Sequence, residues 1–231
     1  MFESWTRRSS VGAVFVALLA SATLVLADEK IIPTEQYNTE KARALAKTYE
    51  GHLRHLSDTI PHCYPWVAIQ KAGLGFRKPK GSANDDRYLS VWVWVEQYYT
   101  PEFAATPRDG RASAMFQRYG LDLLKRLASH SGLLADPSVK GFAVVLSWQK
   151  PVASLPPGAQ PLGETLAVFM EKEKVQKLFK RQISPAEFVK ASFVNTFEGK
   201  QELGTIPLSL HHNSQVQHLV SPDPPDASAQ C

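Results

Sequence analysis

Residues Tyr88–Tyr99 read YLSVWVWVEQYY, and this stretch decides the fold that we expect for the chain. Side chains of a β-strand point alternately to its two faces. One face of this strand would carry Leu89, Val91, Val93 and Val95, and the other would carry Tyr88, Trp92, Trp94 and Tyr98. A strand that is apolar on both faces lies either in a sheet covered on both sides or in a sheet that keeps one face for a partner.

Two amphipathic patterns, over residues 38–60 and 109–127, predict long helices. Apolar residues recur at three- and four-residue spacing from Ala42 to Ile60 in the first, and from Ala112 to Leu127 in the second. These are the long apolar stripes of the chain, so we expect both helices to cover the aliphatic face of the 88–95 strand.

Further strands are predicted at residues 66–77, 139–148, 164–170 and 193–197. The first would form a hairpin with the 88–95 strand, and the second and third would form another. The predicted fold is therefore α+β: an antiparallel sheet of four to five strands, built from two hairpins and one late strand, with two long helices on one face. The order suggests a doubled α-β-β unit, although no residue period links the halves. Ser184, Pro185 and Glu187 also predict a capping box and a short helix.

The N-terminal residues have the pattern of an export signal. Arg7 and Arg8 precede an uncharged apolar run, 11–26, whose roughly 16 residues fall short of the roughly 20 needed to span a bilayer. Small residues favour cleavage after Ala27, with Ala22 as an alternative and an uncleaved anchor as a third interpretation. We expect residues 1–27 to be a signal peptide, 28–220 a single domain and 221–231 a disordered tail. The mature chain would be periplasmic or extracellular, with membrane contact only through an uncleaved anchor.

Charge and cysteine content limit the function classes. The chain has 26 basic and 22 acidic residues, which become 24 and 21, about +3 net, once residues 1–27 are removed. This charge is too small to indicate a nucleic-acid partner. Cys63 and Cys231 are the two cysteines, and export would allow them to form a disulfide; a bonded tail and two free thiols both remain open. We expect the pair not to be essential to the fold, because the residues before Cys231 are too polar to anchor it.

Motifs for metal binding and catalysis are weak. His52, His55 and Asp58 would spread around a helix, about 60° per three-residue step, and do not converge on one ion. His211, His212 and His218 lie in a polar stretch without a carboxylate or thiolate at defined spacing, so we expect no metal and no cofactor. Nucleophile elbows and phosphate-binding glycine loops are absent from the sequence. The basic residues of 172–181 could meet an anionic surface, but interleaved glutamates favour a solvated helix face.

The aromatic face of the 88–95 strand is the candidate binding site, with Trp92, Trp94, Glu96 and Tyr98 as its residues. Aromatic side chains dominate both cores and recognition surfaces; within this face we expect Trp92 to be core and Trp94 to be partly exposed. The sequence favours an exported, non-catalytic protein that binds an envelope protein or a small ligand. Two alternatives are a hydrolase or thiol enzyme assembled from distant residues, among them His62, Cys63 and Glu96, and a structural subunit of an envelope assembly. The oligomeric state is left open.

Overall fold

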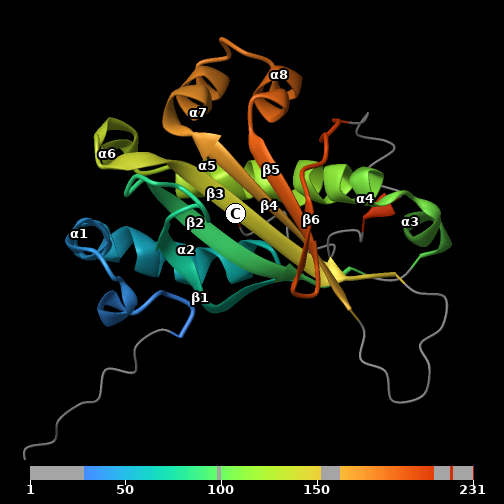
Figure 1. Cartoon of the computed structure of the whole chain (residues 1–231), viewed down its shortest axis with the longest axis horizontal. Helices are drawn as coiled ribbons and strands as arrows, with labels where there is room; N and C mark the ends of the chain where they lie inside the picture. The colour runs from blue at the N-terminus through green and yellow to red at the C-terminus, as the bar shows by residue number, and fades with distance from the viewer. Residues whose placement is uncertain (1–28, 98–99, 152–161, 211–218, 221–230) are drawn as a thin grey trace, which may run out of the picture.

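The computed structural model describes residues 29–97, 100–151, 162–210, 219–220 and 231 (Figure 1). The predicted signal peptide, Tyr98, the histidines of 211–218 and the tail residues 221–230 lie outside these ranges. The helical segments are η1 (Thr34–Gln36), α1 (Glu40–Thr48), α2 (Glu50–Cys63), α3 (Pro101–Ala105), α4 (Arg108–Met115), the π-helical η2 (Phe116–Gly120), α5 (Leu121–Leu127), α6 (Ser131–Ala135), α7 (Lys172–Phe179) and α8 (Pro185–Lys190). The strands are β1 (Val67–Arg77), β2 (Arg87–Val95), β3 (Val139–Gln149), β4 (Gly163–Glu171), β5 (Phe193–Glu198) and β6 (Gln201–Gly204).

These six strands form one sheet in the order β1-β2-β3-β4-β5-β6, so the α+β class is confirmed and the expected count of four to five strands is wrong. The additional strand is β6, which follows β5 after a turn at Gly199, a glycine with the left-handed φ of 55°. Its sequence, QELG, has neither the length nor the apolar alternation that predicts a strand.

The sheet is mixed, and the expectation of a purely antiparallel sheet is also wrong. The β1–β2 and β3–β4 pairs are the two predicted antiparallel hairpins, but β2 and β3 pair in parallel. The helices from Pro101 to Ala135 lie between β2 and β3 and return the chain to the end of the sheet where β2 began. Helices precede an antiparallel hairpin three times along the chain: before β1–β2, before β3–β4 and, as α7 and α8, before β5–β6.

Both predicted long helices are present but divided. The first changes direction at Tyr49, whose φ and ψ of −106° and 19° separate α1 from α2. The second runs from Arg108 to Leu127, with the π-helical turn η2 between α4 and α5. In this turn the Phe116 ring lies so close to Gly120 that a Cβ there would come within 2.3 Å of it. The capping box of Ser184 and Glu187 at the start of α8 is confirmed.

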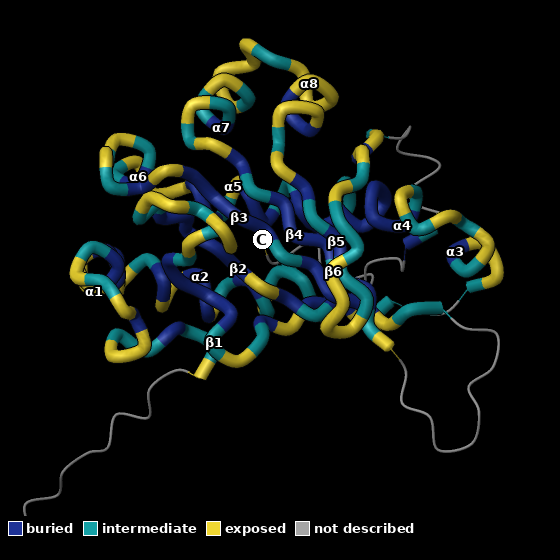
Figure 2. The backbone as a smooth tube through the Cα atoms, in the orientation of Figure 1, coloured by how far each residue is buried: buried dark blue, intermediate teal, exposed yellow. Residues whose placement is uncertain are grey.

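The core lies between the helices and one face of the sheet. In Figure 1 helices α4 and α5 lie behind the sheet, and Figure 2 shows the central strands as buried. Leu89, Val91, Val93 and Val95 are fully buried in this core, as their alternation predicts. Among the helices of the described ranges, none combines the length and apolarity needed to cross a membrane.

Candidate functional site

The second face of β2 belongs to a surface that the described helices leave open. The strand pairings align this face into three rows that cross β2, β3, β4 and β5. The rows are Ser90–Ala143–Phe169–Phe193, Trp92–Val145–Ala167–Asn195 and Trp94–Ser147–Thr165–Phe197. We call these residues the open face. The two middle strands carry small side chains in the second and third rows and Phe169 in the first, where its ring centroid lies 6.1 Å from that of Phe193. Aromatic side chains stand on the strands to either side, about 14 Å apart for three strand spacings.

Trp92 is the most exposed aromatic residue of β2. Its side chain is 38% exposed, and its indole Nε1 donates a hydrogen bond to Ser147 Oγ at 2.8 Å. Ser147 Oγ lies 2.8 Å from Thr165 Oγ1, so a short polar chain across β3 and β4 fixes the orientation of the indole. Phe193, on β5, is 55% exposed.

The expectation that Trp92 is core is wrong. Between Ile69 and Leu74 the chain of β1 leaves its regular pairing with β2, so the strand edge next to Trp92 has no regular partner to cover the indole. Trp94, by contrast, is half-buried because its ring reaches over β3 toward Gly163, where a Cβ would lie 3.6 Å from it. Glu96 is exposed just beyond the end of β2.

One end of the open face is crossed by the β1–β2 loop. Lys80 Nζ lies 3.2 Å from Glu202 Oε2 on β6, and Asn195 Nδ2 donates to Glu202 Oε1 at 2.6 Å. Since β6 is four strands away from β2 in the sheet, residues 78–86 must pass over the face to make this contact. Near this end, the Tyr88 ring packs edge-on against Phe169 with 5.6 Å between ring centroids. Tyr88 can reach over β3 because Gly141 has no side chain there.

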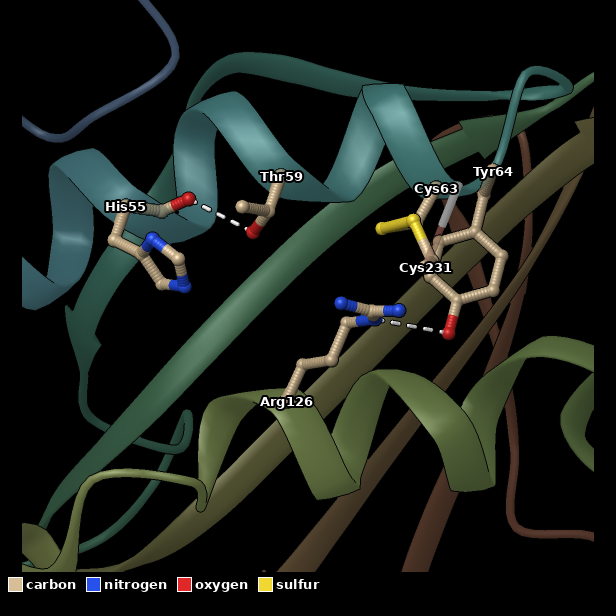
Figure 3. The surroundings of a disulfide bond; sticks show 6 residues. All are labelled: His55, Thr59, Cys63, Tyr64, Arg126 and Cys231. Carbon is tan, nitrogen blue, oxygen red and sulfur yellow. Dashed lines mark hydrogen bonds between the residues drawn. A yellow bond between two sulfur atoms is a disulfide. The ribbon is translucent and has the colours of Figure 1, made fainter. Parts of the chain in front are cut away.

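Cys63 and Cys231 are bonded in the structure, which decides between the two alternatives left open by the sequence (Figure 3). Their Cα atoms are 5.6 Å apart. Beside them Arg126 Nε donates to Tyr64 Oη at 3.1 Å, and a cavity of about 440 Å³ extends from Tyr64 to His55. A disulfide sulfur is not a free thiolate, so Cys63 in this state cannot act as the nucleophile of a thiol enzyme.

A buried ion pair was not predicted from the sequence. Glu164, at the start of β4, accepts hydrogen bonds from Arg111 Nε on α4 and from Trp148 Nε1, both at 2.9 Å, and Arg111 makes a second contact to the other carboxylate oxygen. The pair lines a cavity of about 430 Å³ with Lys150 and Glu198, whose charged groups lie 2.7 Å apart. One signal could have indicated it: Glu164 has the same strand parity as the buried Leu166, Val168 and Met170.

In the sequence, His52, His55 and Asp58 are candidate metal ligands on one helix. No group of three or more histidine, cysteine, aspartate or glutamate side chains in the described ranges is arranged to hold a metal ion. His52 instead lies with Nε2 3.2 Å from the Leu127 carbonyl oxygen, and its ring centroid is 5.3 Å from that of His130. Burial lowers the pKa of His52 below its ordinary value of 6.5; the hydrogen bond with the Leu127 carbonyl oxygen partly opposes this, and the neighbouring charges of His130 and His55 lower the pKa further.

We expect His52 to make the protein less stable at acid pH. A histidine with a lowered pKa in the folded state binds its proton more readily in the unfolded chain, so this contribution to stability is complete above about pH 6.5 and is lost as the pH falls through and below that value. Urea unfolding at a series of pH values should show a smaller loss between pH 7 and pH 5 for His52→Gln than for wild type. Equal losses in the two proteins would contradict this role.

Comparisons with protein-family models, with curated proteins and with solved structures find no match to this chain.

Proposed function

We propose that this protein is an exported, non-catalytic binding protein, and that its open face receives a segment of another envelope protein. The observation that carries the proposal is the exposure of Trp92 and Phe193, at 38% and 55%, on the two outer strands of the open face, with a lane of small side chains (Val145, Ser147, Thr165 and Ala167) on the two strands between. Large exposed aromatic residues are typical of recognition surfaces, where they become the anchors of the bound state.

A protein segment fits this surface better than a small molecule does. Small ligands are usually enclosed in concave cavities, whereas Trp92 and Phe193 stand on the exposed face of a sheet. The lane is lined by Val145, Ala167, Ser147 and Thr165, whose small side chains allow a partner backbone to approach closely, and Phe169 closes it at the end next to Phe193.

Photo-crosslinking tests this proposal. A benzophenone amino acid placed at Phe193 should crosslink to one defined envelope protein, and the same group at Lys47, exposed on α1 at the far edge, should not. Trp92→Ala should abolish the Phe193 crosslink. Equal crosslinking from both positions, or none from Phe193, would contradict the proposal.

We expect Trp92→Ala to separate binding from stability. Because the indole is exposed, its loss should lower the free energy of unfolding by only about 1 kcal/mol. As an anchor of the partner it should contribute at least about 2 kcal/mol, roughly a 30-fold change in affinity. Val93→Ala, on the buried face of the same strand, is the matched control: it should cost about 2 kcal/mol of stability and leave partner affinity unchanged. Thermal unfolding together with titration of the crosslinked partner measures both quantities.

A Trp92→Ala protein that loses about 3 kcal/mol or more would show that this residue is core after all. The enzyme alternative makes a different prediction, turnover of generic ester, phosphate, glycoside or peptide substrates by the purified protein. Such turnover, if retained in Trp92→Ala, would replace the binding proposal.

A further inference from the structure

A second surface, on the helical side of the molecule, combines an apolar groove with basic side chains. The groove has a volume of about 550 Å³ and lies where α5 meets the end of α7 and the start of α8. Its lining is mainly apolar and consists of Leu121, Ala128, Leu178, Phe179 and Pro185, with Lys125, Ser129 and Arg181 completing it. We call this groove and the basic residues around it the α7 corner.

The fold directs Phe179 outward at this corner. Val175, one turn earlier in α7, is fully buried in the core, whereas the Phe179 side chain is 38% exposed at the end of the helix. The chain then turns sharply through Arg181, a non-glycine residue with the left-handed φ of 56°. Gln182 N donates to the Lys177 carbonyl at 2.8 Å, which closes the helix end and keeps Phe179 next to Arg181.

The exposed charges of this corner are predominantly positive. Lys177, Lys180 and Arg181 are exposed within five consecutive residues. Of the nearby carboxylates, Asp122 pairs with Lys125 of the groove lining at 2.8 Å, and Glu171 pairs with Lys140 on β3 at 3.4 Å. The Glu187 carboxylate accepts hydrogen bonds at the α8 capping box, and these bonds lower its pKa. Glu173 and Glu187 are also exposed and keep their negative charges, but Lys177, Lys180 and Arg181 outnumber them, so the corner carries a net positive charge.

We propose that the α7 corner docks on an anionic phospholipid bilayer. The basic residues would contact lipid phosphates, and Phe179 would enter the interfacial layer with the groove beside it open to an acyl chain. Basic residues next to an exposed apolar side chain are the arrangement by which peripheral proteins bind anionic membranes. This inference goes beyond the proposed function and does not depend on it, because it concerns a different surface and a different class of partner.

Co-sedimentation with lipid vesicles tests the charge requirement. The protein of residues 28–231 should bind vesicles that contain phosphatidylglycerol, should not bind vesicles of phosphatidylcholine alone, and should be released by salt. Each basic residue near an anionic surface contributes about a fivefold change in affinity, so the triple variant K177Q/K180Q/R181Q should bind on the order of 100-fold more weakly. The control triple variant, which removes the same charge from exposed sites elsewhere, is K47Q/K78Q/K200Q, and it should bind as wild type does.

Phe179→Ser tests the apolar contribution. It should weaken binding to the anionic vesicles about tenfold while leaving the thermal midpoint within a few degrees, because the side chain is already partly exposed. Unchanged binding by Phe179→Ser would mean simple attraction of opposite charges and would overturn the docking proposal. Equal weakening by the two triple variants would overturn it too. Tight binding of monomeric dodecyl phosphate without any binding to vesicles would assign the groove to a free amphiphile instead of a membrane.

Discussion

Replacing Glu164 with glutamine should destabilise the protein by about 3–5 kcal/mol, because Arg111 would remain buried with an uncompensated charge. The side chains of Arg111 and Glu164 are only 10% and 3% exposed, and the pair joins α4 to β4 across the core boundary. Urea unfolding, read by far-ultraviolet circular dichroism, measures the loss as a shift of the midpoint at constant slope.

The matched control is a surface pair. Lys125 and Asp122 also form a close ion pair, but their side chains are 66% and 49% exposed, so Asp122→Asn should cost less than about 1 kcal/mol. Joint replacement of the buried pair, Arg111→Met with Glu164→Leu, removes both charges and should be more stable than Glu164→Gln alone. If Glu164→Gln were as mild as Asp122→Asn, the carboxylate would not be the compensating charge that the structure indicates.

Loss of the disulfide should have an effect of similar size. In the chain-entropy account, a bond between cysteines 168 residues apart restricts the unfolded chain and stabilises the fold by up to about 5 kcal/mol. Cys231→Ser should therefore lower the thermal midpoint by more than ten degrees under oxidising conditions. Wild type in reductant should match this variant, and Cys63→Ser with Cys231→Ser should match it in either condition.

This prediction replaces the expectation, drawn from the sequence, that the two cysteines are not essential to the fold. That expectation rested on a C-terminal segment with nothing to anchor it. In the structure Val220 is buried, and the Leu219 carbonyl accepts a hydrogen bond from Gln97 Nε2 at 3.2 Å, so the chain is held eleven residues before Cys231. A thermal midpoint that did not change in reductant would contradict this prediction and would support the expectation that the cysteine pair is not essential to the fold.

Local patterns in the sequence predict much of the fold. Alternating and helical apolar spacing places β2, β3, β4 and β5 within a residue or two of their observed bounds, and residues 88–95 assign the buried face correctly. The parallel junction of β2 with β3 was not predictable from these patterns, because hairpin periodicity carries no information on how two hairpins meet. That junction is decided by the helical connection from Pro101 to Ala135.

The candidate site was predicted at the level of the strand face and not of the individual side chain. Alternation places Trp92 and Trp94 on one face, but their burial depends on residues distant in sequence: the irregular stretch of β1 beside Trp92, and Gly163 beneath the Trp94 ring. Arg111 and Glu164 meet across 53 residues, and no local pattern joins them. Shared strand parity could have indicated that Glu164 is buried, but it would not have named the partner.

The bond between Cys63 and Cys231 also determines how the protein would respond to mechanical force. All six strands lie between these cysteines in the chain, so the whole sheet belongs to one covalent ring. Tension applied between residue 29 and the C-terminus would pass through the sulfur–sulfur bond and leave the ring unextended, so that only the residues before Cys63, which include α1 and α2, could be pulled away. A protease that cut once within the ring would produce two fragments that stay joined, and they would separate on a gel only after reduction.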